Sequence, residues 1–262
     1  MIKQEYTFYT DGFFGYGEKG DFSYWSLEHF LPILLLAAAI VVLYRLRFRI
    51  RDWKQEENLR FAMGFVLLIV EMSYYWRLIY VGSGSADLGT LMTKIPIQVC
   101  QWSCILSAFM LMKKSRRLYA VCYFICLTLG LMPLLTPAVI VTTGPGYYRY
   151  YQYWIEHLLP IFGVFYMTFV HGFRVKPKDI GLPLAFLAVL AALSVWGNHT
   201  VERANFMYLA TSTEGDSLAN LLPQNMALRL ALYAAAMLLF FGIVYLPVHL
   251  EKKRNARKEQ TV

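Results

Sequence analysis

The chain has 262 residues, of which 58% are hydrophobic and 16% are charged, and its formal net charge is +8 at pH 7. Because the apolar residues form long blocks, this composition excludes an ordinary soluble domain and indicates an integral membrane protein. The basic residues form short clusters beside these blocks, which is typical of membrane proteins and excludes nucleic acid as a partner.

A helix that crosses a bilayer needs about 20 mostly apolar residues, because its backbone polar groups must be satisfied within the helix. Seven stretches meet this requirement, and the third and sixth are near its lower limit. They cover residues 26–45, 59–81, 95–112, 119–143, 152–171, 180–197 and 226–249. The sequence therefore predicts an all-α, polytopic integral membrane protein with seven transmembrane helices.

The loops between these stretches predict how the helices are oriented. Arginine and lysine are concentrated in alternate loops, at 45–60, 113–117 and 174–178, and in the C-terminal tail. Positively charged loops of this kind stay in the cytoplasm, so the N-terminus is expected outside and the C-terminus inside. The expected organisation is an extracytoplasmic, aromatic-rich segment at 1–25, a transmembrane domain at 26–249 and a basic cytoplasmic tail at 250–262.

The third span, IPIQVCQWSCILSAFM, has small polar residues at the spacing of one helical face. That spacing is typical of close packing between helices, which is the favoured interpretation for Ser103, Cys104 and Ser107. Cys122 and Cys126 lie well inside the fourth span. The cysteines lack the short spacing and turn residues of a zinc site, so we expect neither a metal nor a disulfide.

Cys100 lies near the outer end of the third span, and His157 lies about five residues into the fifth. Both spans are expected to run inward, which places the two side chains on the order of 7 Å below the outer surface. A histidine beside a cysteine can accept and return its proton, the minimum for forming a thioester and passing on its acyl group. Alternatively, Cys100 is an inert buried thiol. His157 then forms hydrogen bonds in a polar pocket, or to backbone carbonyls that Pro160 leaves free.

Other polar residues are expected near the same outer surface. Glu71 lies near the middle of the second span, where an ionisable side chain is a functional candidate. A direct chemical role and a hydrogen bond to a neighbouring helix are both open for it. His29 begins the first span, and Asn205 and Tyr208 lie in the outer segment 198–225. His29 and Asn205 would join the cysteine and the histidine in a polar cup that opens to the outer leaflet, with Glu71 beneath.

Several short motifs occur in an order that resembles a known family. They are EHF with Pro32, Glu71 with Trp76, Pro96 with Cys100, Thr136-Pro137, His157 with Pro160, and NFMYL around Asn205. Their order, and the distance between Cys100 and His157, resemble the YwaF-like family of bacterial polytopic membrane proteins. That family is related to a eukaryotic family of transmembrane ether-lipid acyltransferases. The resemblance extends over nearly the whole chain.

The resemblance implies a lipid acyltransferase of the bacterial cytoplasmic membrane that moves fatty acyl chains between phospholipids without a cofactor. In the eukaryotic relatives, a cysteine of the third span carries the acyl group and a histidine of the fifth assists, and Cys100 and His157 resemble that pair. Asn205, Tyr208 or His29 would position the headgroup or stabilise the developing oxyanion. Membrane lipids are accordingly the expected partners.

Glu71 has a different meaning in each of two functional hypotheses. In an acyltransferase it would support the reacting pair without touching the substrate. In the alternative, a seven-helix transporter or a ligand-binding or sensor protein, Glu71, Arg77 and the histidines would line a polar path. We find no internal repeat of the kind that many transporters have.

Overall fold

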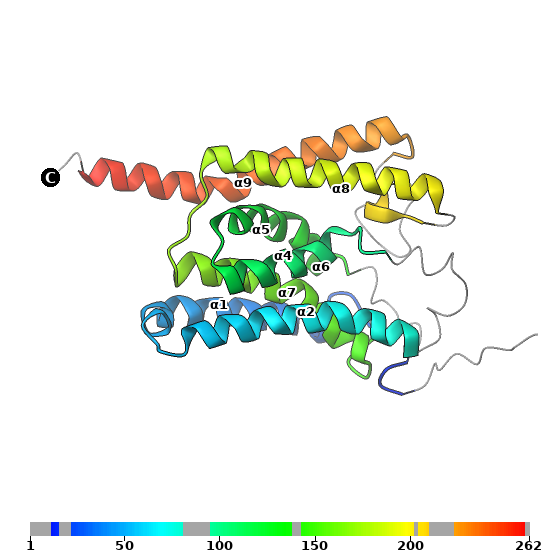
Figure 1. The fold of residues 1–262 in the computed structure, drawn as a ribbon, viewed down its shortest axis with the longest axis horizontal. Helices are drawn as coiled ribbons and strands as arrows, with labels where there is room; N and C mark the ends of the chain where they lie inside the picture. Colours follow the sequence, from blue (N-terminus) through cyan, green and yellow to red (C-terminus); the bar gives the residue numbers. More distant parts are fainter. Residues whose placement is uncertain are drawn as a thin grey trace, which may run out of the picture.

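The computed structural model describes residues 12–15, 22–80, 95–137, 143–201, 204–209 and 223–259, with the backbone alone at 78–80 and 255–259. The regular elements in these ranges are all helical (Figure 1). The α-helices are α1 (Leu27–Arg51), α2 (Glu56–Tyr80), α4 (Val99–Lys113), α5 (Arg116–Thr128), α6 (Met132–Leu135), α7 (Tyr148–Phe169), α8 (Gly181–Thr200) and α9 (Met226–Glu259). The 3-10 turns are η1 (Leu129–Leu131), η3 (Pro177–Ile180) and η4 (Phe206–Tyr208).

A helix is present at each of the seven predicted stretches. The last helix, α9, continues to Glu259, beyond the predicted end at 249, whereas the fourth stretch, predicted at 119–143, ends early because α5, η1 and α6 end at Leu135. The next residue, Thr136, has φ −133° and ψ 77°. A residue before proline is pushed out of the helical region, so Pro137 accounts for the earlier end. Residues 138–142 lie outside the described part of the chain.

Five helical segments of the described chain are long and apolar enough to cross a membrane, and the chain is a multi-pass membrane protein. They are α1, α2, the continuous segment formed by α5, η1 and α6, α8 with its preceding 3-10 turn, and α9. The other two predicted spans are α4, which has 15 residues, and α7, which carries Arg149 and Glu156. These two helices contain Cys100 and His157. A departure from the pattern of a plain membrane helix is expected at a functional site.

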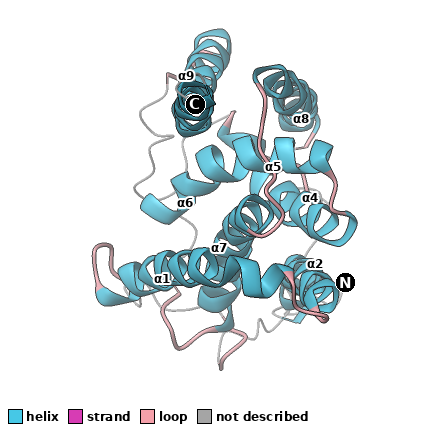
Figure 2. Cartoon of the chain, turned by 90° about the vertical axis from the view of Figure 1, so that its left-hand side faces the viewer, coloured by secondary structure: helices cyan, strands magenta, loops and turns pink. Residues whose placement is uncertain are grey.

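Helix α7 lies near the middle of the bundle (Figure 2). It contacts α1, α2, α4 and α5, and α4 also contacts α2 and α5. Figure 1 shows α1 and α2 along one side of the bundle and α8 and α9 along the other. The core between them contains Leu111, Tyr119, Phe124, Val164 and Met167, each nearly fully buried. The N-terminal ends of α4 and α7 are thereby held side by side.

Most of the predicted terminal segments lie outside the described residues. Of the aromatic-rich segment at 1–25, the structure describes 12–15 and 22–25. One of its contacts reaches the bundle, because Arg77 Nη2 of α2 donates a hydrogen bond to Gly15 O at 2.7 Å. The predicted tail at 250–262 begins as a continuation of α9, which stays helical to Glu259.

Candidate functional site

The N-terminal half of α7 presents a buried polar face. Arg149, Gln152 and Glu156 recur at intervals of three and four residues and so share one side of the helix. Gln152 Nε2 donates to Glu156 Oε2 at 2.8 Å, and Arg149 Nη1 donates to the same oxygen at 3.2 Å. Arg149 also donates to Gln152 Oε1. A buried ion pair needs such additional hydrogen bonds to offset its loss of hydration.

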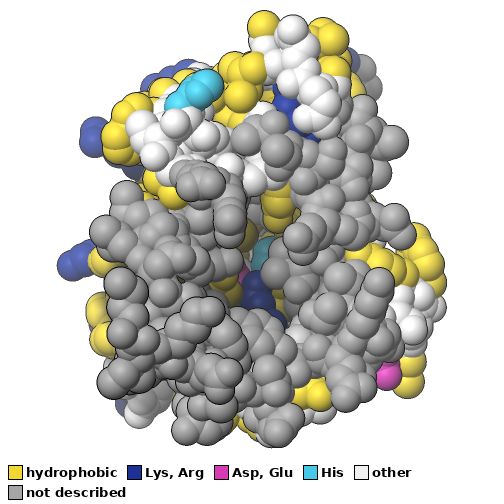
Figure 3. All heavy atoms as spheres, turned by 90° about the vertical axis from the view of Figure 1, so that its right-hand side faces the viewer, with side chains coloured by type: hydrophobic (Ala, Val, Ile, Leu, Met, Phe, Trp, Pro, Cys, Tyr) yellow, Lys and Arg dark blue, Asp and Glu magenta, His cyan; other side chains and the backbone are white. Residues whose placement is uncertain are grey.

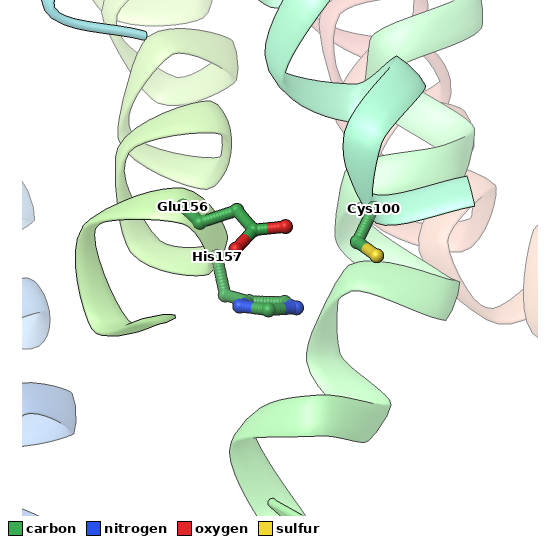
Figure 4. Close-up of side chains that lie close together, drawn as sticks. All are labelled: Cys100, Glu156 and His157. Carbon is green, nitrogen blue, oxygen red and sulfur yellow. The ribbon is translucent and has the colours of Figure 1, made fainter. Parts of the chain in front are cut away.

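Cys100 lies in the first turn of α4, facing this part of α7 (Figure 4). The start of α4 is fixed by Gln101, whose Oε1 accepts from the Gln98 backbone N–H at 3.1 Å. Gln101 Nε2 donates to Tyr75 Oη at 2.8 Å, which joins α4 to α2. The Cys100 side chain is partly exposed. The first turn of a helix favours negative charge, whereas burial and the neighbouring carboxylates of Glu156 and Glu71 disfavour it at Cys100.

Cys100, Glu156 and His157 converge at this point (Figure 4). The cysteine sulfur, a glutamate carboxylate oxygen and a histidine ring nitrogen lie within 4.8 Å of one another. His157 Nδ1 lies 2.7 Å from Tyr153 O, and because a carbonyl oxygen only accepts, Nδ1 carries the proton. In the neutral ring Nε2 then has a lone pair, and Figure 4 shows a ring nitrogen that points toward Cys100.

The same three side chains offer a thiol, an imidazole and a carboxylate, which are zinc ligands in other proteins. The sequence predicted no metal, on the spacing of the cysteines alone. The tertiary structure adds His157 and Glu156, which that argument did not consider. Glu156 Oε2 already accepts hydrogen bonds from Arg149 and Gln152, so a cation at this point would compete with a guanidinium for the carboxylate.

Glu71 reaches the same cluster from α2. It is buried, hydrogen-bonds with Tyr75, and lies close enough to Glu156 and Arg149 for their charges to interact. Its Oε1 atom is buried and has no hydrogen-bond partner among the described residues. Arg149 can balance only one of the two carboxylates. Both interpretations of Glu71 from the sequence, a hydrogen bond and a chemical role, therefore remain open.

The segment between α8 and α9 contributes Tyr208 through the turn η4. Asn198 of α8 binds this turn at both ends of Phe206, accepting from its N–H at 2.7 Å and donating to its carbonyl at 3.2 Å. The Met207 N–H donates to Gln98 Oε1 at 2.9 Å, which joins the turn to the start of α4. Met207 and Tyr208 have φ of 52° and 55°, which is a strained region for residues other than glycine.

Tyr208 lies close enough to Cys100 for their charges to interact. Burial raises the pKa of Tyr208 to about 12, so its hydroxyl stays protonated and can donate a hydrogen bond. Asn205 precedes η4, and its backbone carbonyl accepts from the Tyr208 N–H at 3.3 Å. The structure thus brings Tyr208, one of the two residues predicted in this segment, into the surroundings of Cys100.

His29 is held in a separate set of contacts. Its Nδ1 accepts from the Trp25 backbone N–H at 3.2 Å, and its Nε2 lies 2.8 Å from Leu134 O, to which it donates. A neutral imidazole has one donor and one acceptor, so both nitrogens are engaged. His29 therefore joins the start of α1 to α6, and both of its ring nitrogens bind backbone groups away from Cys100.

The side chains that the sequence reasoning missed are Glu156, Arg149 and Gln152. The sequence did contain a sign of Glu156, because it lies inside the predicted span 152–171. An ionisable residue within a span is a functional candidate, which is the rule that identified Glu71. Figure 3 views the end of the molecule where α2 ends and α4 and α7 begin. A hollow is visible there, and basic, acidic and histidine side chains lie at its base.

A comparison with known families matches residues 24–245 to the TMEM164 family. The matched range includes every site residue described above and at least part of every helix. No curated protein and no solved structure matches the chain. Because the family match covers most of its length, the chain belongs to the TMEM164 family.

Proposed function

We propose that the protein is a membrane-embedded lipid acyltransferase that moves fatty acyl chains between phospholipids. One observation carries the proposal: the Cys100 sulfur and a His157 ring nitrogen lie within 4.8 Å, and Nδ1 of that ring is held by a carbonyl. Such contacts are often longer than a hydrogen bond without substrate and shorten when it binds. The resemblance to transmembrane ether-lipid acyltransferases and the membership of the TMEM164 family support the same chemistry.

The reaction has two halves, and both use the same proton carrier. In the first, the Cys100 thiol passes its proton to His157 Nε2 while the sulfur attacks the ester carbonyl carbon of a phospholipid. The carbon–oxygen ester bond breaks, and the departing lysophospholipid oxygen takes the proton from His157. In the second, the hydroxyl of an acceptor lysolipid gives its proton to His157 and attacks the thioester. The carbon–sulfur bond breaks, and the proton returns to Cys100.

Tyr208 and Glu71 have supporting roles in this scheme. The Tyr208 hydroxyl donates to the oxyanion that forms on the ester carbonyl, as preorganised donors do in other acyl transfers. Asn205 holds the backbone of the turn that carries Tyr208. Glu71 and Glu156 set the charge around the pair, and Arg149, which pairs with Glu156, also interacts with the charge of Glu71. His29 acts at a distance from the chemistry, by fixing α1 against α6.

The topology that accompanies this function has seven membrane crossings, with the N-terminus outside and the C-terminus in the cytoplasm. The alternation of basic loops supports that topology. It requires α4 and α7 to cross the membrane in addition to the five more apolar helical segments. In the same proposal, the chain belongs to the bacterial YwaF-like branch and lies in the bacterial cytoplasmic membrane, and the Cys100 site faces the outer leaflet.

The test uses purified full-length protein in vesicles that contain a phospholipid with a labelled acyl chain and an unlabelled lysophospholipid. We expect label to move to the acceptor and a hydroxylamine-sensitive acyl group to form on the chain. Cys100→Ser and His157→Ala should reduce turnover by at least about 100-fold. Cys122→Ala is the matched control, because this cysteine is buried in α5, and it should retain turnover. Turnover by Cys100→Ser and His157→Ala at the rate of the unmodified chain would refute the proposal.

The alternative, a transporter or a ligand-binding or sensor protein, draws support from the unpaired Oε1 of Glu71 within a polar cluster. In that case Glu71→Gln should abolish ligand binding or flux in vesicles, and Cys100→Ser should leave it intact. The acyltransferase proposal predicts the reverse order of importance, with the larger loss from Cys100→Ser. The pair of variants therefore separates the two functions.

A further inference from the structure

A pocket of about 350 Å³ lies at the opposite end of the bundle from Cys100. It is formed by the turn between α1 and α2, the first turns of α2 and the end of α4. Its basic side chains are Arg51, Lys54, Arg60, Lys113 and Lys114, and its acidic side chains are Glu56 and Glu57. The lining is therefore rich in positive charge.

Both acidic residues of the lining lie beside cations of the protein. Glu57 is exposed, and its Oε1 lies 3.8 Å from Arg60 Nη2. Glu56 is buried, and its Oε1 accepts from Arg60 Nε at 2.8 Å, from Tyr166 Oη at 2.9 Å and from His171 Nε2 at 2.8 Å. Lys114 Nζ lies 3.7 Å from Glu56 Oε2. These contacts satisfy the Glu56 carboxylate within the protein, and Arg51 Nε pairs with Asp52 Oδ1 at 3.0 Å. Among the described residues, Lys54 and Lys113 are then the lining cations that can attract an anion without first leaving an ion pair.

Carbonyl groups at the C-terminal end of α4, which also lines the pocket, are hydrogen-bonded by Arg60. Arg60 Nη1 donates to the carbonyls of Leu111 and Met112 at 2.6 and 3.3 Å. Carbonyls at a helix C-terminus carry partial negative charge, which this guanidinium offsets. The walls are closely packed, because a Cβ at Gly64 of α2 would lie 2.8 Å from the Met112 side chain. The basic lining is thus presented by a rigid junction of two helices.

We propose that this pocket binds a phosphate-bearing anion, either the headgroup of an anionic phospholipid or a soluble phosphate. Both sources offer the same phosphate oxygens to lysine and arginine donors. Trp53 also lines the pocket and is 51% exposed, and tryptophan is favoured at the level of lipid headgroups. A volume of about 350 Å³ is within the range of small-molecule sites. The proposal does not depend on acyl transfer at Cys100.

The test measures the thermal unfolding midpoint of the full-length protein in detergent during titration with a short-chain phosphatidylglycerol, a phosphatidylcholine of equal chain length or inorganic phosphate at constant ionic strength. The double variant Lys54→Gln with Lys113→Gln removes two exposed charges from the pocket. The matched control, Arg117→Gln with Lys253→Gln, removes two exposed charges outside it. All four side chains are exposed, so neither double variant disturbs the core.

We expect the anion to raise the midpoint of the unmodified chain and of the control, with phosphatidylcholine causing a smaller change. The pocket variant should bind the anion about thirtyfold more weakly. A response to phosphatidylglycerol alone identifies a lipid headgroup, and a response to inorganic phosphate identifies the soluble source. If neither anion shifts the midpoint, or if both double variants lose the shift equally, the pocket is not an anion site.

Discussion

The thiol of Cys104 donates a hydrogen bond to the backbone carbonyl of Glu156, with 3.2 Å between sulfur and oxygen. In a regular helix that carbonyl would accept from the N–H of residue 160, but Pro160 has none. Cys104 therefore satisfies the carbonyl that Pro160 leaves free. The bond joins α4 to α7 one turn of α4 away from Cys100.

This relationship predicts a coupling between the two positions. Cys104→Ala leaves a buried carbonyl unpaired and should lower the free energy of unfolding by about 1–3 kcal/mol. Pro160→Ala supplies the missing N–H, so Cys104→Ala should cost less in that background. Unfolding of the two single variants and the double variant in detergent measures the coupling. Cys104→Ser, which retains a donor, is the control. Additive losses would contradict the assignment.

A second prediction concerns Gln98, which holds η4 at the start of α4. Gln98→Ala removes the acceptor of the Met207 N–H and should let the strained turn move away from Cys100. The Cys100 thiol should then react with a soluble maleimide about fivefold faster, in proportion to a net hydrogen bond of about 1 kcal/mol. Gln55→Ala, at the far end of the bundle, is the matched control and should leave the rate unchanged. Equal labelling rates for all three chains would count against this role of η4.

Chelation gives a third prediction. Because Arg149 and Gln152 already occupy Glu156 Oε2, we expect removal of divalent metals to leave the rate of Cys100 labelling unchanged. The measurement compares labelling before and after treatment with a chelator, and Cys100→Ser identifies the signal from the other thiols. A marked rise after chelation, reversed by added Zn²⁺, would show that the cysteine, glutamate and histidine hold a metal.

A fourth prediction concerns pH. Burial lowers the pKa of His171, against the opposing effect of its hydrogen bond to Glu56, and Arg60 and Lys114 are the nearby cations. As pH falls through about 6.5, the unfolded chain takes up a proton that the folded chain does not, so His171 lowers the stability toward acid. His171→Gln retains a donor to Glu56 but does not titrate.

The measurement is the change in the unfolding midpoint between about pH 7.5 and about pH 5.5 for the two chains. The decline should be shallower for His171→Gln than for the unmodified chain. Parallel declines in both would show that other groups cause the loss at acid pH.

The helices were predictable because the length of each apolar stretch and the charge of each loop follow directly from the order of residues in the sequence. Depth could be read in the same way, and it placed Cys100 and His157 at one level, where the structure brings them together. The rotation of each helix about its axis could not be read. That rotation turns Glu156 toward Cys100 and gives His29, at a similar depth, a partner on α6. Depth alone therefore did not distinguish His157, which lies beside Cys100, from His29, which does not.

The 15 residues of α4 rise by about 22 Å, which is less than the hydrocarbon thickness of about 30 Å. A bilayer adapts to so short a helix by thinning around it. Thinning on the outer side would bring the ester carbonyls of surrounding lipids toward the residue at which α4 begins, and Cys100 is the second residue of that helix. Under the proposed function, in which α4 crosses the membrane and Cys100 takes up the acyl chain, membrane thickness would therefore control substrate access, and we expect faster acyl transfer in bilayers of short acyl chains than in bilayers of long ones.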